Sequence, residues 1–260
     1  RKSSHLVDWI SHVDFPGLDN RVLSEINKYD HWAASRPALS YNTVNLESFD
    51  INQDKIYASN EYFQKLGLDL DSVLKGKDVL DIGGSCMDAW RFWAAGIDSL
   101  QQVEVSKASQ IYGRDRIRSK LASDSDSLQK TTFHTCPAEY LPFRDACFDV
   151  VFSRSSIHHT QRPLSLVEIE RVLKPGGLIL LFEPLQQVYV NRAMHALRKV
   201  RNIDRGTDDP LTIKDIRLAQ SLFEEVIFAP RSFLVMNLQV MSAWLTKRGN
   251  PSIPVLLARK

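Results

Sequence analysis

The sequence predicts an α/β fold with a mostly parallel sheet, and three features of the chain support this. From Lys77 onward, short apolar runs alternate with helical patterns, which is typical of parallel strands covered by helices on both faces. The run from Val79 to Ser85, VLDIGGS, passes from apolar residues through an acid into a paired-glycine turn. A later run ends in an acid at Glu104, 23 residues after Asp81. This is the spacing of one β–α–β unit, so both acids are expected at one edge of the sheet.

The region before the first strand, residues 1 to about 70, shows helical rather than strand periodicity. Three segments carry this pattern. They are residues 6–13, a second amphipathic helix with its apolar face on Leu23, Ile26 and Trp32, and a third segment from Tyr57 through Leu66.

The remainder of the chain contains seven runs that we expect to form strands. Five follow one another with helical patterns between them, and two lie near the C-terminus. The expected strands are 78–82, 101–105, 131–135, 148–152, 178–183, 225–228 and 255–258.

The acid at Glu104 indicates a nucleoside ligand, because a carboxylate ending the second strand can accept from both ribose hydroxyls. A dinucleotide site requires G-x-G-x-x-G, but here the second and third glycine positions hold Ser85 and Asp88. The Asp88 carboxylate would repel a pyrophosphate, which argues against a nicotinamide oxidoreductase. A zwitterionic ligand fits better, with its carboxylate on the N–H groups of the turn and its ammonium near Asp81. S-adenosylmethionine is such a ligand.

Two further blocks complete a recognisable pattern. One runs from Cys136 to Ser153 and contains PAEYLPF and FDVVFS, and the other runs from Glu168 to Leu181 and contains RVLKPGG. Together with the glycine turn and the pair His158–His159, they resemble the class I S-adenosylmethionine-dependent methyltransferases, especially the small-molecule, type 11-like branch. The resemblance covers roughly residues 75 to 185 and lies in the combined order and spacing of the blocks.

This resemblance implies a Rossmann-like class I methyltransferase sheet of seven mostly parallel strands with an N-terminal helical cap. Residues 1–70 would form the cap, and residues 71–260 the S-adenosylmethionine-binding domain. Within that domain, residues 186–222 would be a substrate-recognition insertion. The apolar C-terminal strand matches the antiparallel hairpin with which family members end.

The resemblance also implies the cofactor contacts. Gly83 and Gly84 would meet the methionine part, Glu104 the ribose hydroxyls, the main chain of Ala138 the adenine, and Ser153 would lie beside the sulfonium. The full set of expected cofactor-binding residues is Asp81, Gly83, Gly84, Ser85, Glu104, Val105, Pro137, Ala138, Glu139 and Ser153.

Three positions depart from the family pattern. Ser85 and Met87 stand where family members usually carry glycine. Pro137 stands where an aspartate commonly accepts a hydrogen bond from the adenine amino group.

The pair His158–His159 follows the fourth strand, where the transferred methyl group should point. A hydroxyl acceptor needs a base, and histidine titrates near neutral pH. Similar pairs occur in sugar and natural-product O-methyltransferases, where the first histidine can serve as base. We therefore predict His158 as the base and Glu183, at the end of the fifth strand, as its orienting partner. His159 as base, or a purely structural pair, are the alternatives.

Composition narrows the remaining functions. A net charge of +2 over 260 residues does not indicate nucleic-acid binding. No apolar run reaches the roughly 18 residues that span a bilayer. The three cysteines form no C-x-x-C pair, so no metal site is indicated. The first five residues lack the apolar stretch of a signal peptide, and we expect a cytoplasmic protein. A basic amphipathic pattern at 190–205 predicts either contact with anionic lipid or a phosphorylated partner, or a solvated helix whose apolar stripe covers the active site.

The sequence thus predicts an enzyme that methylates a small molecule. The favoured reaction is O-methylation of a hydroxyl on a sugar, natural product or lipid-like acceptor, with an anionic or carrier-attached acceptor also compatible. An N- or C-methyltransferase and a non-catalytic cofactor-binding scaffold with the same fold are the alternatives.

Overall fold

The structure is a computed structural model, which describes residues 20–36, 69–184, 210–229 and 255–260. Several sequence predictions fall outside these ranges: the helices expected at 6–13 and 57–66, and the basic helix at 190–205. The division into a cap, a cofactor-binding domain and a recognition insertion stays a prediction.

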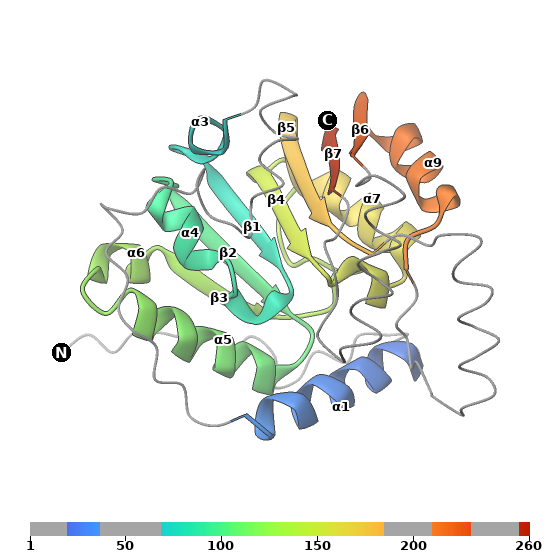
Figure 1. Ribbon diagram of the computed structural model, residues 1–260. Helices are drawn as coiled ribbons and strands as arrows, with labels where there is room; N and C mark the ends of the chain where they lie inside the picture. Colours follow the sequence, from blue (N-terminus) through green and yellow to red (C-terminus); the bar gives the residue numbers. More distant parts are fainter. Residues whose placement is uncertain (1–19, 37–68, 185–209, 230–254) are drawn as a thin grey trace, which may run out of the picture.

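The described residues form a seven-stranded sheet with the order β3-β2-β1-β4-β5-β7-β6 (Figure 1). Strands β1 to β5 are parallel, and β7 is antiparallel to both β5 and β6. The predicted α/β class with a Rossmann-like, mostly parallel sheet is confirmed. The strands are β1 (Asp78–Ile82), β2 (Ser99–Glu104), β3 (Thr131–Thr135), β4 (Phe148–Arg154), β5 (Leu173–Phe182), β6 (Glu225–Ala229) and β7 (Val255–Arg259).

Strand β5 begins earlier than the sequence predicts, at Leu173 rather than at residue 178. Leu173 pairs with Phe148, and the register then shifts so that Leu178 pairs with Val150. The residues between them include Pro175, Gly176 and Gly177, whose turn chemistry hides the first pairing from a strand pattern.

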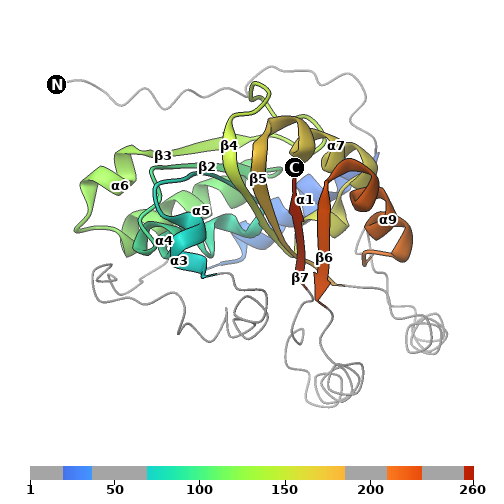
Figure 2. The ribbon, with the colours of Figure 1, turned by 90° about the horizontal axis from the view of Figure 1, so that it is seen from above.

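Helices cover both faces of the sheet, and Figure 2 shows α4 and α5 on one side and α7 and α9 on the other. The strands alternate between two apolar cores, so that Val79 packs toward one side and Leu80 toward the other. This two-sided burial explains why β1, β4 and the second half of β5 are largely apolar in sequence. The helices are α3 (Leu70–Leu74), α4 (Ala89–Ala94), α5 (Lys107–Lys120), α6 (Ser125–Gln129), α7 (Arg162–Val172) and α9 (Ile213–Leu222).

The strand order reverses between β1 and β4, because the chain continues from β1 toward β2 and β3 but returns through β4 to β5 on the other side. Such a reversal opens a crevice at the carboxyl ends of the strands, where open α/β sheets bind their ligands. At the opposite ends, Lys174 joins the two central strands through ion pairs to Asp78 (2.9 Å) and Asp149 (2.8 Å).

Helix α1 (Asn20–Ala34) runs across the carboxyl ends of the strands (Figure 1). At its start, the Arg21 guanidinium donates to the main-chain oxygens of His158 and His159. Toward its end, Asp30 accepts from the Ser106 hydroxyl at the start of α5. The helix is therefore tied to connections on both sides of the crevice.

The predicted second N-terminal helix is confirmed by α1, but its predicted apolar face is wrong in part. Leu23 is 45% exposed, whereas the buried residues are Val22 and Glu25. The inward face is shifted because α1 covers a cavity rather than an apolar sheet surface.

Candidate functional site

A cavity of about 630 Å³ lies at the carboxyl edge of the sheet, beneath α1. Its wall combines the connections after the parallel strands with the inward face of α1. The lining residues are Val22, Glu25, Tyr29, Trp32, Ile82, Gly83, Gly84, Ser85, Met87, Val103, Glu104, Val105, Cys136, Pro137, Ala138, Glu139, Arg154, Ser155, Ser156, His159, Thr160 and Phe182.

The turn after β1 has an unusual backbone that the glycines permit. Gly83 has φ 76° and ψ −159°, and a Cβ there would run into the Ser156 side chain. Ser85 has φ 48° and ψ 50°, and Cys86 has φ 55°, so two non-glycine residues adopt the left-handed conformation. This left-handed conformation explains why the methyltransferases that the sequence resembles usually carry glycine at the Ser85 position. Ser85 adopts the same conformation at a steric cost.

Glu104, at the end of β2, holds this turn in place. Its Oε1 accepts from the Ser85 N–H at 2.7 Å and from the Ser85 hydroxyl at 3.2 Å. Burial raises the pKa of the Glu104 carboxyl to about 7, although the hydrogen bonds from Ser85 act in the opposite direction. A buried carboxylate of this kind gains from any ligand that offers further hydroxyl donors.

Helix α5 packs directly against the turn through Gly113. A Cβ on Gly113 would lie 2.8 Å from the carbonyl carbon of Ser85, so only glycine allows this approach. One turn further along α5, the Arg116 guanidinium donates to the Ser85 carbonyl at 3.1 Å. The strained turn is therefore supported from both β2 and α5.

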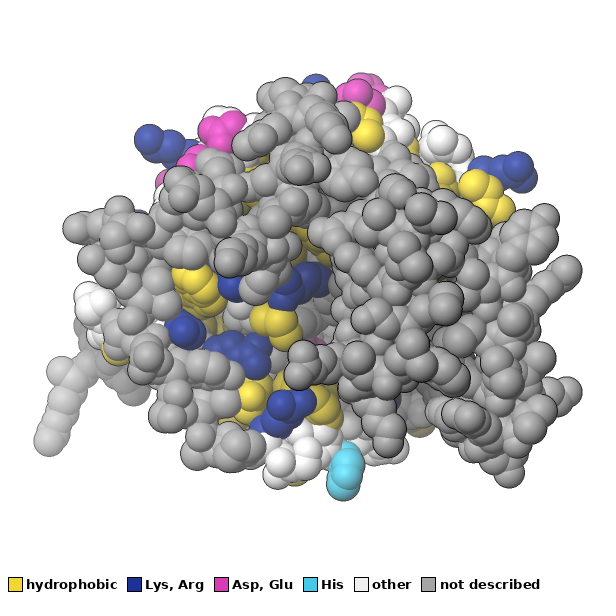
Figure 3. Space-filling model, viewed as in Figure 1, with side chains coloured by type: hydrophobic (Ala, Val, Ile, Leu, Met, Phe, Trp, Pro, Cys, Tyr) yellow, Lys and Arg dark blue, Asp and Glu magenta, His cyan; other side chains and the backbone are white. Residues whose placement is uncertain are grey.

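A cluster of buried acids and arginines surrounds the same turn. Asp81 is fully buried in β1, and the pKa of its carboxyl is raised well above its usual range by burial and by the nearby Asp88 and Glu104. Asp88 forms ion pairs with Arg91 (3.2 Å) and Arg154 (3.1 Å). Figure 3 shows Lys and Arg side chains in dark blue gathered among hydrophobic ones near the centre of this face.

The connection after β3 forms the far end of the cavity. The Cys136 N–H donates to the Glu104 carbonyl at 2.9 Å, which places Pro137 and Ala138 beside the end of β2. The carboxylate of Glu139 accepts from the Gln161 N–H at 2.6 Å, so it anchors the start of α7 as well as lining the cavity.

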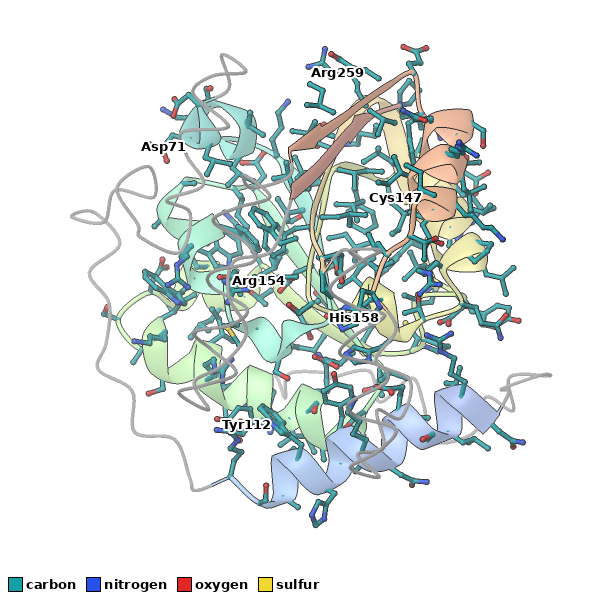
Figure 4. All side chains as sticks on the ribbon, turned by 45° about the vertical axis from the view of Figure 1, so that its right-hand side comes forward. Asp71, Tyr112, Cys147, Arg154, His158 and Arg259 are labelled. Atoms are coloured by element: carbon teal, nitrogen blue, oxygen red, sulfur yellow. The ribbon has the colours of Figure 1, made fainter. Side chains whose placement is uncertain are left out.

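The connection after β4 is organised by the carboxylate of Glu183. Its Oε1 accepts from the N–H groups of Ser156 and Ile157, both at 3.0 Å, and from the Ser153 hydroxyl at 3.4 Å. Its Oε2 lies 2.6 Å from Nδ1 of His158. Figure 4 shows His158 and Arg154 at the end of the strands near α1, and Cys147 toward the opposite end.

The two adjacent histidines have different surroundings. His158 is buried among the residues beneath the cavity wall, whereas His159 lines the cavity. Nδ1 of His159 lies 3.5 Å from Glu25 on α1, and Tyr29 packs edge-on against the His159 ring. The two imidazole rings are 3.9 Å apart between centroids.

Of the predicted site residues, most of the cofactor set line the cavity. These are Gly83, Gly84, Ser85, Glu104, Val105, Pro137, Ala138 and Glu139. Four others are buried and do not line it: Asp81, Ser153, His158 and Glu183. Ser153, His158 and Glu183 support the wall from below, because Glu183 makes its hydrogen bonds inside the connection after β4 and to the end of that strand.

The sequence did not assign several residues that complete the wall. Val22, Glu25 and Tyr29 come from α1, and their spacing of three and four residues is the one signal that they share a face. Phe182, at the end of β5, and Arg154, at the end of β4, also line the cavity.

Comparison with known proteins agrees with this geometry. Residues 94–181 match the family described as "Methyltransferase domain". The chain is 28% identical over 167 residues to the ubiquinone/menaquinone biosynthesis C-methyltransferase UbiE of Haemophilus ducreyi, covering 60% of this chain and 62% of that protein. The chain thus spans less than two thirds of the length of this relative.

Two solved structures share the fold. One is described as a sarcosine dimethylglycine methyltransferase from Galdieria sulphuraria, with a TM-score of 0.55, 14% identity, and coverage of 93% of this chain and 98% of that one. The other is geranyl diphosphate C-methyltransferase from Streptomyces coelicolor, in complex with Mg²⁺, geranyl diphosphate and S-adenosyl-L-homocysteine. Its TM-score is 0.53, with 12% identity and the same two coverages, 93% and 98%. Among the described residues, no helix is both long and apolar enough to cross a membrane.

Proposed function

We propose that this chain, which resembles the class I S-adenosylmethionine-dependent methyltransferases in its domain match and its fold, binds S-adenosylmethionine and methylates a small-molecule acceptor. The observation that carries the proposal is the bond between the Glu104 carboxylate and the Ser85 turn at the reversal point of the sheet. An acid and a glycine-rich turn at this place form a site for a nucleoside with a charged tail.

The residues present fit this cofactor. Glu104 is a buried carboxylate that lines the cavity, and burial raises its pKa, so two further hydrogen bonds from ribose hydroxyls would favour its charged form. Gly83 and Gly84 expose backbone at the turn for the carboxylate of the methionine part. The main chain of Pro137 and Ala138 would flank the adenine beside β2.

When bound, S-adenosylmethionine supplies an activated methyl group, and the contribution of the chain is mainly alignment. Asp81 is buried beneath the turn, where a bound ammonium would favour the charged form of its carboxyl, and the neighbouring Asp88 is held in place by Arg154. Ser153 and Glu183 support this end from below, because Glu183 fixes the connection after β4. Helix α1 and Phe182 form part of the cavity wall around this end.

The finer proposal concerns the acceptor. We favour a hydroxyl on a sugar, natural product or lipid-like molecule, because ionisable groups line the acceptor end of the cavity. A carbon acceptor is the second candidate, and the names of the relatives favour it, since UbiE is called a C-methyltransferase. An acceptor carbon activated by a neighbouring hydroxyl would need the same removal of a proton.

Calorimetry of the full chain against S-adenosylhomocysteine and against NAD tests the cofactor. We expect binding of S-adenosylhomocysteine and none of NAD. The opposite result would overturn the proposal. Binding of S-adenosylhomocysteine with no methyl transfer to hydroxyl, amine or carbon acceptors would instead favour a cofactor-binding scaffold.

A further inference from the structure

Glu25 is a carboxylate in an unusual position. Its residue is only 3% exposed, yet it lines the cavity, and neither carboxylate oxygen has a hydrogen-bond partner among the described residues. Nζ of Lys28, on a half-exposed side chain, lies 3.6 Å from one oxygen, and Nδ1 of His159 lies 3.5 Å from the other. A buried carboxylate without hydrogen bonds is costly, so such a group in a cavity wall indicates a ligand that completes it.

Glu25 lies at the end of the cavity that we assign to the acceptor, and the strand order shows why. The ribose site at Glu104 ends β2, and the adenine site follows β3. His159 follows β4, which lies two strands away from β2 on the other side of β1, or roughly 10 Å at the usual strand spacing. Arg21 anchors the start of α1 to this same connection, so Glu25 and His159 face each other there.

We infer that Glu25 and His159 form a proton-accepting pair that binds the hydroxyl of an acceptor with a largely apolar body; this inference rests on the proposed methyl-transfer function. The neighbouring wall explains the apolar body, because Val22 on α1 and Phe182 at the end of β5 also line the cavity.

The charges around Glu25 favour a neutral donor over a cationic one. Lys28 and Arg21 on α1, and His158 on the connection after β4, all act on the Glu25 carboxylate. Burial nevertheless raises its pKa, because desolvation outweighs these cations. An added ammonium would be repelled by the surrounding positive groups, whereas a neutral hydroxyl would not. Once His159 has taken the proton of that hydroxyl, the imidazolium would supply the missing hydrogen bond to Glu25.

The proposed step balances without any further reactant. The O–H bond of the acceptor breaks, and its proton goes to the imidazole of His159, whose Nδ1 faces Glu25. Bound S-adenosylmethionine would supply the methyl group that the acceptor oxygen takes, and the electron pair of the broken sulfur–methyl bond would stay on sulfur. The positive charge on the imidazole is then stabilised by the Glu25 carboxylate.

The test uses two probes of the same shape, with the full chain saturated with S-adenosylhomocysteine. Para-nitrophenol carries the transferable proton, and para-nitroanisole carries a methyl group in its place. We expect the chain to bind para-nitrophenol about tenfold more tightly or better, as one charge-assisted hydrogen bond would give. Absence of para-nitrophenol binding, or equal binding of the two probes, would overturn the inference.

Variants then assign the preference to the pair. Glu25→Leu should abolish the preference, whereas Asn27→Ala, on the exposed side of α1, should retain it. Glu25→Gln keeps the shape of the side chain and should retain binding but lose the absorption band of bound nitrophenolate, which reports proton transfer. A preference that survives Glu25→Leu, or a nitrophenolate band that survives Glu25→Gln, would contradict the inference.

A cationic probe separates the remaining possibility. If benzyltrimethylammonium displaces para-nitrophenol and depends on Glu25, the site binds cations and the hydroxyl assignment is wrong. Different results would contradict the proposed function and the inference about Glu25 and His159. A chain that binds no S-adenosylhomocysteine contradicts the proposed function, whereas one that binds it without a preference for para-nitrophenol contradicts only this inference.

Discussion

The N–H of Ser85 donates to Oε1 of Glu104 at 2.7 Å, so the acid that ends β2 fixes the turn that follows β1. One carboxylate thereby holds a left-handed serine in place and presents itself to the cavity. The shape of the turn and the proposed affinity for a nucleoside are consequently coupled through a single side chain.

Replacing Glu104 by alanine should weaken binding of S-adenosylhomocysteine by about 1.5–3 kcal/mol, the scale of a lost charge-assisted hydrogen bond. Calorimetry on the wild type and the variant measures this difference. Unchanged affinity would show that another residue receives the ribose.

Replacing Glu104 by glutamine should stabilise the ligand-free chain at neutral pH. Burial raises the pKa of this carboxyl from its ordinary value of 4.5 to about 7. Because the pKa is higher in the folded state than in the unfolded state, protonation of Glu104 stabilises the folded chain. This stabilisation is fully present below pH 4.5 and is lost as the pH rises through about 7. Glutamine stays neutral and keeps an acceptor for Ser85, so it avoids this loss.

The difference in unfolding free energy between Glu104→Gln and the wild type should grow between these two pH values and level off above them. Its upper bound is about 3 kcal/mol. Chemical denaturation across this pH range measures the difference. A constant difference at every pH would show that the carboxyl of Glu104 titrates normally.

Replacing Gly113 by alanine should destabilise the chain and weaken cofactor binding. In an ordinary helix the change gains up to about 1 kcal/mol of helix propensity. Here the new Cβ would lie 2.8 Å from the Ser85 carbonyl carbon, and overpacking of this kind costs about 1–3 kcal/mol. Thermal melts with and without S-adenosylhomocysteine test this. Ile111→Ala, at an exposed position of α5, is the control, and a Gly113→Ala variant that is more stable than the wild type would refute the close contact.

Much of the fold was predictable because the central strands are buried on both faces and read as apolar runs ending at acids or turns. Glu104 was predictable for the same reason, since an acid directly after a buried run must lie at the edge of the sheet. Glu25 was not, because a single glutamate in an amphipathic helix is usually solvent-facing. Its burial follows from the phase of α1 over the cavity, which depends on contacts at Arg21 and Asp30 with residues far away in sequence.

The roles of the two histidines could not be separated from sequence either. They are adjacent in a short 3-10 turn, Ile157–His159, and their rings lie against each other, with centroids 3.9 Å apart. The hydrogen bond to Glu183 turns His158 into the protein, and His159 is then left to line the cavity.

The alanine variant of His158 should therefore lose mainly stability, and that of His159 mainly turnover. His158→Ala removes a partner 2.6 Å from the buried Glu183 carboxylate, so it should lower stability by about 1–3 kcal/mol and loosen the connection after β4. Glu183→Gln should resemble it, because the same carboxylate also holds the N–H groups of Ser156 and Ile157.

His159→Ala should leave stability and cofactor affinity near those of the wild type, yet lower kcat for a hydroxyl acceptor by about 10²–10⁴, the usual share of a general base. Thermal melts, S-adenosylhomocysteine binding and turnover at saturating cofactor separate the two patterns. If His158→Ala instead loses turnover at full stability while His159→Ala stays active, the base is His158, as the sequence alone predicts, and the pairing of His159 with Glu25 has no part in proton removal.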